Sequence, residues 1–337
     1  MADYKNIKGF NIQYLDSDPP NPIEGQMWFN STTQTLKGAE VGGAPIGTWS
    51  SGGAVNTARE TAYSTGSQTA NLFYGGLATP GNSVDTELYN GSAWTEVNNL
   101  NTGLRGGASA GSSSIALKIA GYTGTTASDT VESWNGTCWS EITEINTPRL
   151  DSSAAGISNT SAIIFGGSTM PGFSPVANTE SWNGTSWTEV NDLSLATNSL
   201  RGGGTQTSAL ATGGYAPPGT RSTKTESWNG TSWSSGGNMN LARNNHGYSG
   251  NSNTNGLVFA GDNPSAPTTV NTEFYNGTSW TEVNNLSVGR YRHGGSSNIG
   301  TNNAALATSG LNSSDGRITT VEEWLAPDPL VKTFTTS

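Results

Sequence analysis

A tryptophan returns at nearly constant spacing along most of this 337-residue chain. The steps between successive copies are 45, 45, 48, 46 and 47 residues. A second aromatic residue stands five positions before each of five copies, and a glutamate precedes each second aromatic by two positions. Units of this kind bury their apolar faces only by stacking on neighbours, so the repeat constrains the whole fold. The repeat positions are Trp49, Trp94, Trp139, Trp187, Trp233 and Trp280, and Trp324 extends the second series.

Each period predicts four short strands. A Gly/Ser/Ala-rich segment such as RGGASAGSSS (105–114) comes first, followed by an apolar run that ends in glycine, such as LFYGG (72–76). The segments TESWN (179–183) and TSWTEV (185–190) supply the third and fourth strands. Helices are excluded because Gly, Ser, Thr and Asn are too frequent for helix interiors. Four strands in about 47 residues predict the blade of a β-propeller.

The unit resembles the kelch repeat. The resemblance lies in a glycine doublet after an apolar strand, a spaced aromatic pair and an arginine that opens the next unit, and it covers about residues 46–326. It implies an all-β fold, a six-bladed kelch-like β-propeller of four-stranded blades. The kelch family includes binding scaffolds and enzymes, so the resemblance leaves function open.

The two ends of the repeat complement each other. TTVEEWL (319–325) is a third strand with no fourth strand after it, and GTWSSGG (47–53) is a fourth strand with nothing before it. We expect the N- and C-terminal strands, around Trp49 and Trp324, to pair and close the ring. Closure removes open sheet edges, which otherwise invite aggregation.

The repeated Asn-Gly pairs predict two-residue type I′ hairpins. Such a turn would place Trp182 opposite Thr185 and Glu180 opposite Trp187, with both tryptophans on one face. We expect these aromatic residues to form the core between blades, with sugar stacking as the lesser alternative. The same Asn-Gly-Thr/Ser triplets are formal glycosylation sequons, but the turn geometry accounts for every residue.

A buried network of charges is the second repeated feature. The glutamates, among them Glu180, could form six equivalent ion pairs between blades with arginines that follow the repeated tryptophans, because an unpaired carboxylate beside indoles is costly. Six identical pairs indicate architecture, not catalysis. The arginines are Arg59, Arg105, Arg149, Arg201, Arg243 and Arg290.

No catalytic, cofactor-binding or metal-binding residue is predicted, and the chain is not expected to be an enzyme. The two histidines, His246 and His293, each stand three residues after a repeated arginine. They therefore derive from the repeat, and a metal site there is the lesser alternative. The single cysteine, Cys138, excludes an intrachain disulfide.

Recognition is expected in the loops between the second and third strands, since these vary in length and content while the strands do not. All six loops should emerge on one rim, opposite the Asn-Gly turns. The candidate ligand-contact residues are Tyr122, Phe173, Tyr215, Arg221 and Arg317.

Residues 1–45 do not follow the repeat and are predicted to be an anchor or docking segment with a small hairpin in GQMWFNSTTQTLKG (25–38). Residues 46–326 form the propeller, and residues 327–337 a C-terminal tail. PPNPIEGQMWFNSTTQTLK (19–37) resembles segments of tailed-bacteriophage virion proteins, of the type P-x-x-G-x-x-W-[FY]-N-x-T-x-x-x-L-[KR], found in tail fibres and other appendages.

These features together lead to an expected function. The chain is expected to be a non-enzymatic virion structural protein of the tail-fibre, appendage or head-decoration type, assembled in the bacterial host cytoplasm and serving host-surface attachment. Its expected partners are other virion proteins, through residues 1–45, a host-surface glycan and further copies of itself. The alternative is a kelch-like carbohydrate- or protein-binding module outside any virion.

Other classes of partner have less support. A glycan-cleaving enzyme would need acidic and arginine side chains clustered in only some blades. The formal charge of −10 and the absence of a basic run argue against nucleic acid. No apolar stretch approaches the roughly 20 residues that span a bilayer, so no membrane insertion is expected.

Overall fold

The protein is an all-β molecule that divides into two compact units. The computed structural model describes residues 12–19, 26–40, 47–296, 299–314, 316–326 and 330–334. Within these ranges every regular element is a strand, and no helix is long and apolar enough to cross a membrane. The small unit consists of Met1–Ile46 and Ala326–Ser337, and the large unit of Gly47–Leu325.

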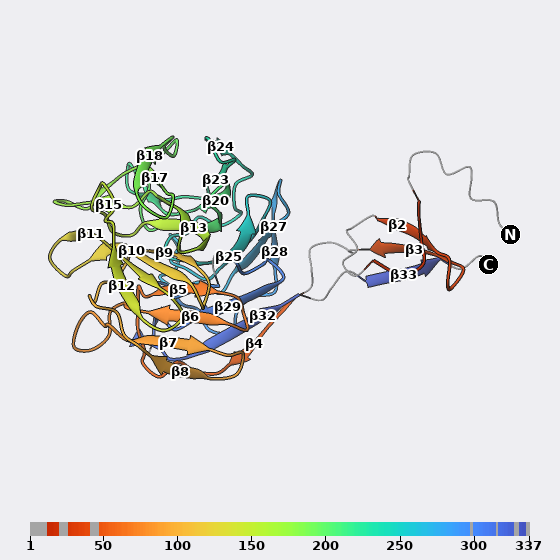
Figure 1. Ribbon diagram of the computed structural model, residues 1–337, viewed down its shortest axis with the longest axis horizontal. Coiled ribbons are helices and arrows are strands. Elements are labelled where there is room, and N and C mark those ends of the chain that lie inside the picture. Colours follow the sequence, from red (N-terminus) through yellow and green to blue (C-terminus); the bar gives the residue numbers. More distant parts are fainter. Residues whose placement is uncertain are drawn as a thin grey trace. The chain divides into compact units, whose positions relative to one another are not determined.

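The large unit contains repeated antiparallel sheets, which we number in chain order (Figure 1). The first sheet is β5(Tyr63–Gly66), β6(Asn71–Tyr74), β7(Thr86–Tyr89) and β8(Trp94–Val97). The second is β9(Ala108–Gly111), β10(Ala116–Tyr122), β11(Ala127–Trp134) and β12(Trp139–Ile142). The third is β13(Ser153–Ser158), β14(Ser161–Phe165), β17(Thr179–Trp182) and β18(Trp187–Val190).

The next two sheets repeat this order. The fourth is β19(Arg201–Thr205), β20(Ser208–Thr212), β23(Thr225–Trp228) and β24(Trp233–Ser235). The fifth is β25(Gly247–Ser252), β26(Asn255–Phe259), β27(Thr272–Tyr275) and β28(Trp280–Val283). Three short hairpins extend the loops between second and third strands: β15(Ser168–Thr169) with β16(Ser174–Pro175), β21(Tyr215–Ala216) with β22(Thr220–Arg221), and β30(Leu311–Asn312) with β31(Gly316–Arg317).

The sixth sheet combines segments from both ends of the large unit. It has three strands, β29(Ala304–Thr308), β32(Val321–Leu325) and β4(Thr48–Gly52). The strands β32 and β4 pair antiparallel, with Trp324 opposite Trp49. An isolated bridge joins Gly294 to Thr308, where the other sheets have their first strand.

The expected register of the Asn-Gly hairpins is wrong, because the loop is two residues longer than predicted. Trp182 lies opposite Trp187, not Thr185, and Glu180 lies opposite Glu189. The turn holds four residues because the Asn183 side-chain oxygen accepts the backbone N–H groups of Thr185 and Ser186, both at 2.9 Å. Gly184 (φ 92°) is the only turn residue with positive φ, whereas a type I′ turn needs two.

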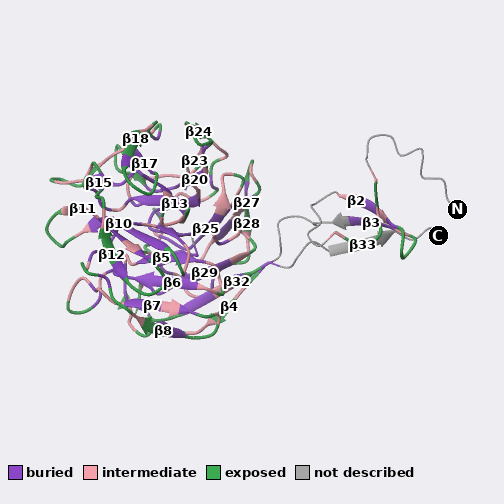
Figure 2. Cartoon of the chain, in the orientation of Figure 1, coloured by how far each residue is buried: buried purple, intermediate pink, exposed green. Residues whose placement is uncertain are grey.

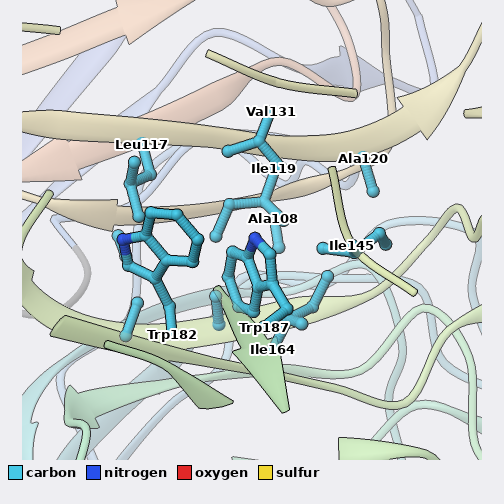
Figure 3. Packing of buried hydrophobic residues seen from close by; sticks show 12 residues of the cluster. Ala108, Leu117, Ile119, Ala120, Val131, Ile145, Ile164, Trp182 and Trp187 are labelled. Atoms are coloured by element: carbon cyan, nitrogen blue, oxygen red, sulfur yellow. The ribbon is translucent and has the colours of Figure 1, made fainter. Parts of the chain in front are cut away.

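The aromatic pairs nevertheless share a face and fill the space between sheets. Trp182 and Trp187, with ring centroids 5.1 Å apart, belong to the third sheet and pack on Leu117, Ile119 and Val131 of the second (Figure 3). Figure 2 shows the inner strands almost wholly buried and the turns exposed. The apolar core therefore lies between neighbouring sheets.

Each fourth-strand tryptophan also donates an indole hydrogen bond to the preceding sheet. Trp139 and Trp280 donate to the hydroxyls of Thr86 and Thr225, at 3.1 and 3.0 Å. Trp49 likewise donates to the Thr272 hydroxyl at 3.0 Å, so the β4 segment makes the bond of a sixth unit. A buried indole N–H needs a hydrogen-bond acceptor, and the preceding sheet supplies it. The other donors are Trp94, Trp187 and Trp233.

Each repeated glutamate is buried and accepts hydrogen bonds from the connection that enters its sheet. We call this contact the buried clamp. In the fifth sheet, Glu273 is 1 % exposed and accepts the Asn240 backbone N–H at 2.6 Å and the Arg243 guanidinium at 2.6 Å. Arg243 also donates to the Ala260 and Asn271 carbonyls, at 3.0 and 2.8 Å. The pair thus fastens a connection to the sheet that it enters. The sequence-based expectation that these pairs join one blade to the next is wrong.

The expectation of six equivalent Arg–Glu pairs is also incorrect. Four sheets have the pair: Arg59–Glu87, Arg149–Glu180, Arg243–Glu273 and Arg290–Glu322. In the second and fourth sheets a lysine elsewhere in the sheet replaces the arginine: Lys118 on β10 pairs with Glu132 at 3.1 Å, and Lys224, just before β23, pairs with Glu226 at 3.0 Å. The carboxylate keeps a cation in every case, which is what its burial requires.

Two cycles of backbone hydrogen bonds link the six sheets. In one cycle, the glycine that ends each apolar run donates to a carbonyl of the connection entering the next sheet, from Gly76→Leu104 at 2.9 Å round to Gly310→Arg59 at 2.9 Å. A Cβ on Gly76 would lie 2.6 Å from the Cβ of Ala62, so this position needs glycine. The remaining donors are Gly121, Gly167, Gly214 and Gly261.

The second cycle runs in the opposite direction and closes on itself. Thr61 N–H donates to the Arg292 carbonyl at 2.8 Å, Arg292 to Asn245 at 2.9 Å, and so on back to Thr61. All six members are left-handed, with φ between 50° and 62°. We call them the central ring: Thr61, Gly106, Asp151, Ser199, Asn245 and Arg292.

The small unit is one four-stranded sheet made from both ends of the chain. Its order is β1(Gln13–Leu15), β2(Met27–Asn30), β3(Thr35–Glu40) and β33(Leu330–Phe334). The pair β2–β3 is an antiparallel hairpin in the segment where the sequence predicts one. Residues 330–334, within the expected C-terminal tail 327–337, form β33, which lies antiparallel beside β3. The expected anchor residues 1–11, 20–25 and 41–45 lie outside the described residues.

We predict that the buried clamp is worth far more than its exposed counterpart. Arg243→Met should lower the free energy of unfolding by about 3–5 kcal/mol, because Glu273 would remain buried without a cation. Arg221→Met is the matched control, since Arg221 and its partner Asp262 are 29 % and 17 % exposed, and should cost about 1 kcal/mol or less. Urea denaturation measures both, and equal losses would contradict the clamp.

Candidate functional site

One rim of the large unit carries both the connections that enter the sheets and the variable loops between second and third strands. The connection entering each sheet forms an isolated bridge with the residue that follows the second strand, as between Glu60 and Leu77 or Arg105 and Tyr122. These connections and the loops between second and third strands therefore lie at the same end of the sheets. The Asn-Gly turns lie at the other end, because each third strand runs away from its loop. We call the first end the loop rim.

The five residues expected to contact a ligand lie on the loop rim in separate groups. Tyr122 and Phe173 come together, with ring centroids 5.9 Å apart, and Phe173 is 48 % exposed. Tyr215 is paired across a short hairpin with Arg221. Arg317 lies apart, on the hairpin of the sixth sheet.

Two of these five residues already have acidic partners. Arg221 donates two hydrogen bonds to Asp262, at 2.9 and 2.7 Å. Arg317 donates to Glu60 at 2.8 Å, and Glu60 also accepts from Arg292 at 3.1 Å. Their charge is neutralised between neighbouring loops, so they shape the rim more than they offer charge to a ligand.

The two repeated arginines that do not pair with a repeated glutamate lie near one another on the loop rim. Arg105 and Arg201 make no pair with a repeated glutamate, and both lie within electrostatic range of Asp151, as does Arg292. Arg105 donates to Asn82 at 2.9 Å and lies 5.0 Å over the Tyr122 ring. We call Arg105, Asp151, Arg201 and Arg292 the central mouth, since two of them belong to the central ring.

The carboxylate of Asp151 forms no ion pair and accepts no hydrogen bond among the residues that the structure describes. Burial raises its pKa, and the charges of Arg201, Arg292 and Arg105 oppose that rise. Burial likewise lowers the pKa of Arg201, whose guanidinium donates one hydrogen bond, to the Leu200 carbonyl at 3.0 Å. The mouth therefore holds three cations and one anion that are near one another without direct contact.

A cavity of about 50 Å³ lies between the starts of the first strands of five sheets and the segment 293–295 of the sixth. Arg201 lines it together with Ser152, His246 and His293. A water needs roughly 10–15 Å³, so the cavity has room for a small polar group. The full lining is 61–64, 107–109, 152–154, 201–202, 246–248 and 293–295.

Three buried polar atoms of the lining residues have no hydrogen-bond partner: Ser152 Oγ, His246 Nδ1 and His293 Nε2. Thr212 donates its hydroxyl to the Arg201 carbonyl at 2.7 Å, so it accepts from His246 Nε2, at 3.0 Å. His293 Nδ1 donates to the Gly294 carbonyl at 2.9 Å. Each neutral imidazole is thus left with one unprotonated nitrogen that can accept a hydrogen bond.

This chemistry is suited to binding. The described residues contain no group of three His, Cys, Asp or Glu side chains placed to hold a metal ion. The site instead combines guanidinium donors, an unpaired carboxylate and imidazole acceptors around a polar cavity. Such a set can bind a ligand that carries both an anionic group and hydroxyls.

The central mouth was not predicted from the sequence, because Arg105 and Arg201 were expected to belong to the repeated pairs. A signal was present in the spacing: the four clamping arginines stand 10 residues after a repeated tryptophan, whereas Arg105 stands 11 and Arg201 stands 14 residues after one. Asp151 and Arg292 carried no such signal, since only the fold brings them to the ring.

We predict that the two buried histidines make the protein sensitive to mild acid. Burial lowers the pKa of His246 well below its ordinary value of 6.5 and that of His293 to about 3, helped by the charges of Arg243 and Arg290. The unfolded chain therefore binds more protons than the folded one below pH about 6.5, and stability falls as pH drops from there towards 3.

A His246→Leu, His293→Leu double variant tests this, because Leu200 occupies the equivalent position in the fourth sheet. Between pH 7 and 5 the slope of unfolding free energy against pH should flatten by up to about 1.4 kcal/mol per pH unit for each histidine. Chemical denaturation at several pH values measures the slope. An unchanged slope would show that the histidines are not buried in the neutral form.

No protein-family model matches this chain, and no curated protein sequence matches it.

Proposed function

We propose that the six sheets of the large unit are the blades of a closed, six-bladed kelch-like β-propeller. The two cycles of backbone hydrogen bonds support closure, because each returns to its first sheet after six steps. The pairing of β4 with β32 and the Trp49–Thr272 bond support the sixth blade. Closure of this kind leaves only the short outer strand of each blade as a sheet edge.

We further propose that the protein is a non-enzymatic structural protein of a bacteriophage virion, of the tail-fibre, appendage or head-decoration type, and that it presents the propeller for attachment to the host surface. The observation that carries this proposal is the small unit. Its β3 and β33 are neighbours in one sheet, so the whole propeller is inserted between two strands of a separate module. An inserted, rigid head on a module made from both chain ends suits display.

Three residues of the segment that resembles phage virion proteins contact Asp18 in the small unit. Asp18 accepts hydrogen bonds from Trp28 at 2.9 Å, from Asn30 at 2.8 Å and from Lys37 at 2.6 Å. These bonds lower the pKa of Asp18 to about 2, the Lys37 bond most. Trp28 is fully buried. The motif therefore encodes a folded module, which supports its use as a common attachment unit to other virion proteins.

The alternative, a carbohydrate- or protein-binding module outside any virion, is favoured by the same loop rim. Variable loops around a polar cavity suit recognition whether or not the chain is part of a particle. The two proposals differ in what the small unit does, so the decisive test concerns that unit.

We predict that disrupting the small unit releases the protein from particles without unfolding the propeller. In phage carrying Trp28→Ala, antibody against the large unit should label few or no purified particles, while the free protein keeps the wild-type thermal transition of the large unit. Glu189→Ala, on an exposed edge strand of the propeller, is the control and should incorporate normally. Normal incorporation of Trp28→Ala would overturn the attachment role, and absence of the wild-type chain from particles would overturn the virion proposal.

A further inference from the structure

The arginines of this chain fall into two groups with different uses. The sequence holds nine, and four of them are the buried clamps on repeated glutamates. The other five all lie on the loop rim, in a protein whose net charge is −10. Three of those five form ion pairs, Arg221 with Asp262, and both Arg317 and Arg292 with Glu60. The cations of the central mouth are Arg292 and the two arginines that form no ion pair among the described residues, Arg105 and Arg201.

Arg201 is the cation with the least compensation. It lines the cavity and makes a single hydrogen bond, to a backbone carbonyl, and among the described residues no carboxylate forms an ion pair with it. A guanidinium stays charged in proteins and presents donors that match a carboxylate in two-point geometry. A partly buried charge of this kind is stabilised by an anionic ligand more than a surface charge would be.

The polar groups of the cavity near Arg201 need a ligand that donates hydrogen bonds. The unprotonated nitrogens of His246 and His293 can only accept, and the hydroxyl of Ser152 can donate or accept. Asp151 adds an acceptor at the mouth. A simple inorganic anion would satisfy the arginines and leave these acceptors unpaired, whereas hydroxyl groups would satisfy them.

We propose that the central mouth binds an acidic sugar, whose carboxylate pairs with Arg201 and Arg292 and whose hydroxyls donate to Asp151 and to the imidazoles of the cavity. The cavity of about 50 Å³ admits a substituent and not a whole ring, so the ring lies at the mouth. From there Arg105, Tyr122 and Phe173 form a continuous row outward, with Arg105 5.0 Å over Tyr122 and Phe173 5.9 Å from it. The row gives a second sugar an aromatic surface to pack on.

This inference rests on the proposed role in host attachment for its biological setting, but the binding itself does not depend on it. The full-length protein is titrated with glucuronate, N-acetylneuraminate and 3-deoxyoctulosonate, each beside the alcohol made by reducing its carboxyl group. Acetate and sulfate are separate arms. Ligand-observed nuclear magnetic resonance at millimolar concentrations measures each dissociation constant.

We expect at least one sugar acid to bind more tightly than its alcohol and more tightly than acetate or sulfate. Arg201→Gln should weaken that sugar acid by roughly 10- to 100-fold, as expected for loss of a hydrogen bond to a charged group. Lys224→Gln, which removes a cation from the same sheet outside the mouth, should bind as the wild type does. Arg292→Gln, at a side chain 44 % exposed, keeps the test open if Arg201→Gln does not fold, and should also weaken binding.

Three outcomes would overturn the proposal. They are equal binding of a sugar acid and its alcohol, equal binding of acetate and the sugar acid, and failure of all three sugar acids to bind. Unchanged affinity in the folded arginine variants would equally place the ligand elsewhere. Particle labelling is independent of these measurements, so failure here leaves the virion proposal standing, and failure there leaves sugar binding standing.

Discussion

A buried carboxylate in the third strand of every sheet is the interaction on which the large unit depends. Each of these glutamates is at most 4 % exposed and accepts a backbone N–H from the connection that enters its sheet. Desolvating a carboxylate is expensive, so the chain must bring a cation to it. Where arginine does so, its remaining donors also fasten the end of the second strand to the start of the third, as Arg243 shows. The need to neutralise one buried carboxylate thus fixes the path of three segments, namely the entering connection, the end of the second strand and the start of the third.

The same need explains why two units could change without losing the fold. In the second sheet, Leu104 takes the place of the arginine and Lys118 supplies the cation from the second strand. In the fourth sheet, Lys224 supplies it from the start of the third strand. These exchanges leave Arg105 and Arg201 without a structural pair, and the central ring places them near Asp151. Departures from the repeat therefore coincide with the polar site, as expected if scaffold and recognition are separate demands on the sequence.

The small unit follows a different logic, in which one exposed carboxylate organises a short motif. Asp18 gathers the indole of Trp28, the amide of Asn30 and the amine of Lys37. A hairpin of this size cannot bury much apolar surface alone, and the added strands β1 and β33 enlarge the sheet. The cost is that the fold of this unit depends on both ends of the chain.

The spacing of tryptophans and glutamates in the sequence determined the all-β class, the four-strand repeat and the pairing of Trp49 with Trp324, because periodicity and strand count survive without knowledge of contacts. The sequence could not decide the hairpin register, since Asn183 can form a turn with its side chain as well as with its backbone. Nor could it identify the cation for each glutamate, because Lys118 reaches Glu132 only across paired strands. The strand at 330–334 needed β3 as its partner, and the central mouth needed four residues from the second, third, fourth and sixth sheets or the connections that enter them. Local sequence patterns therefore specify the repeated strands. A site formed where the repeat is broken depends on the tertiary structure, because its residues are far apart in the sequence.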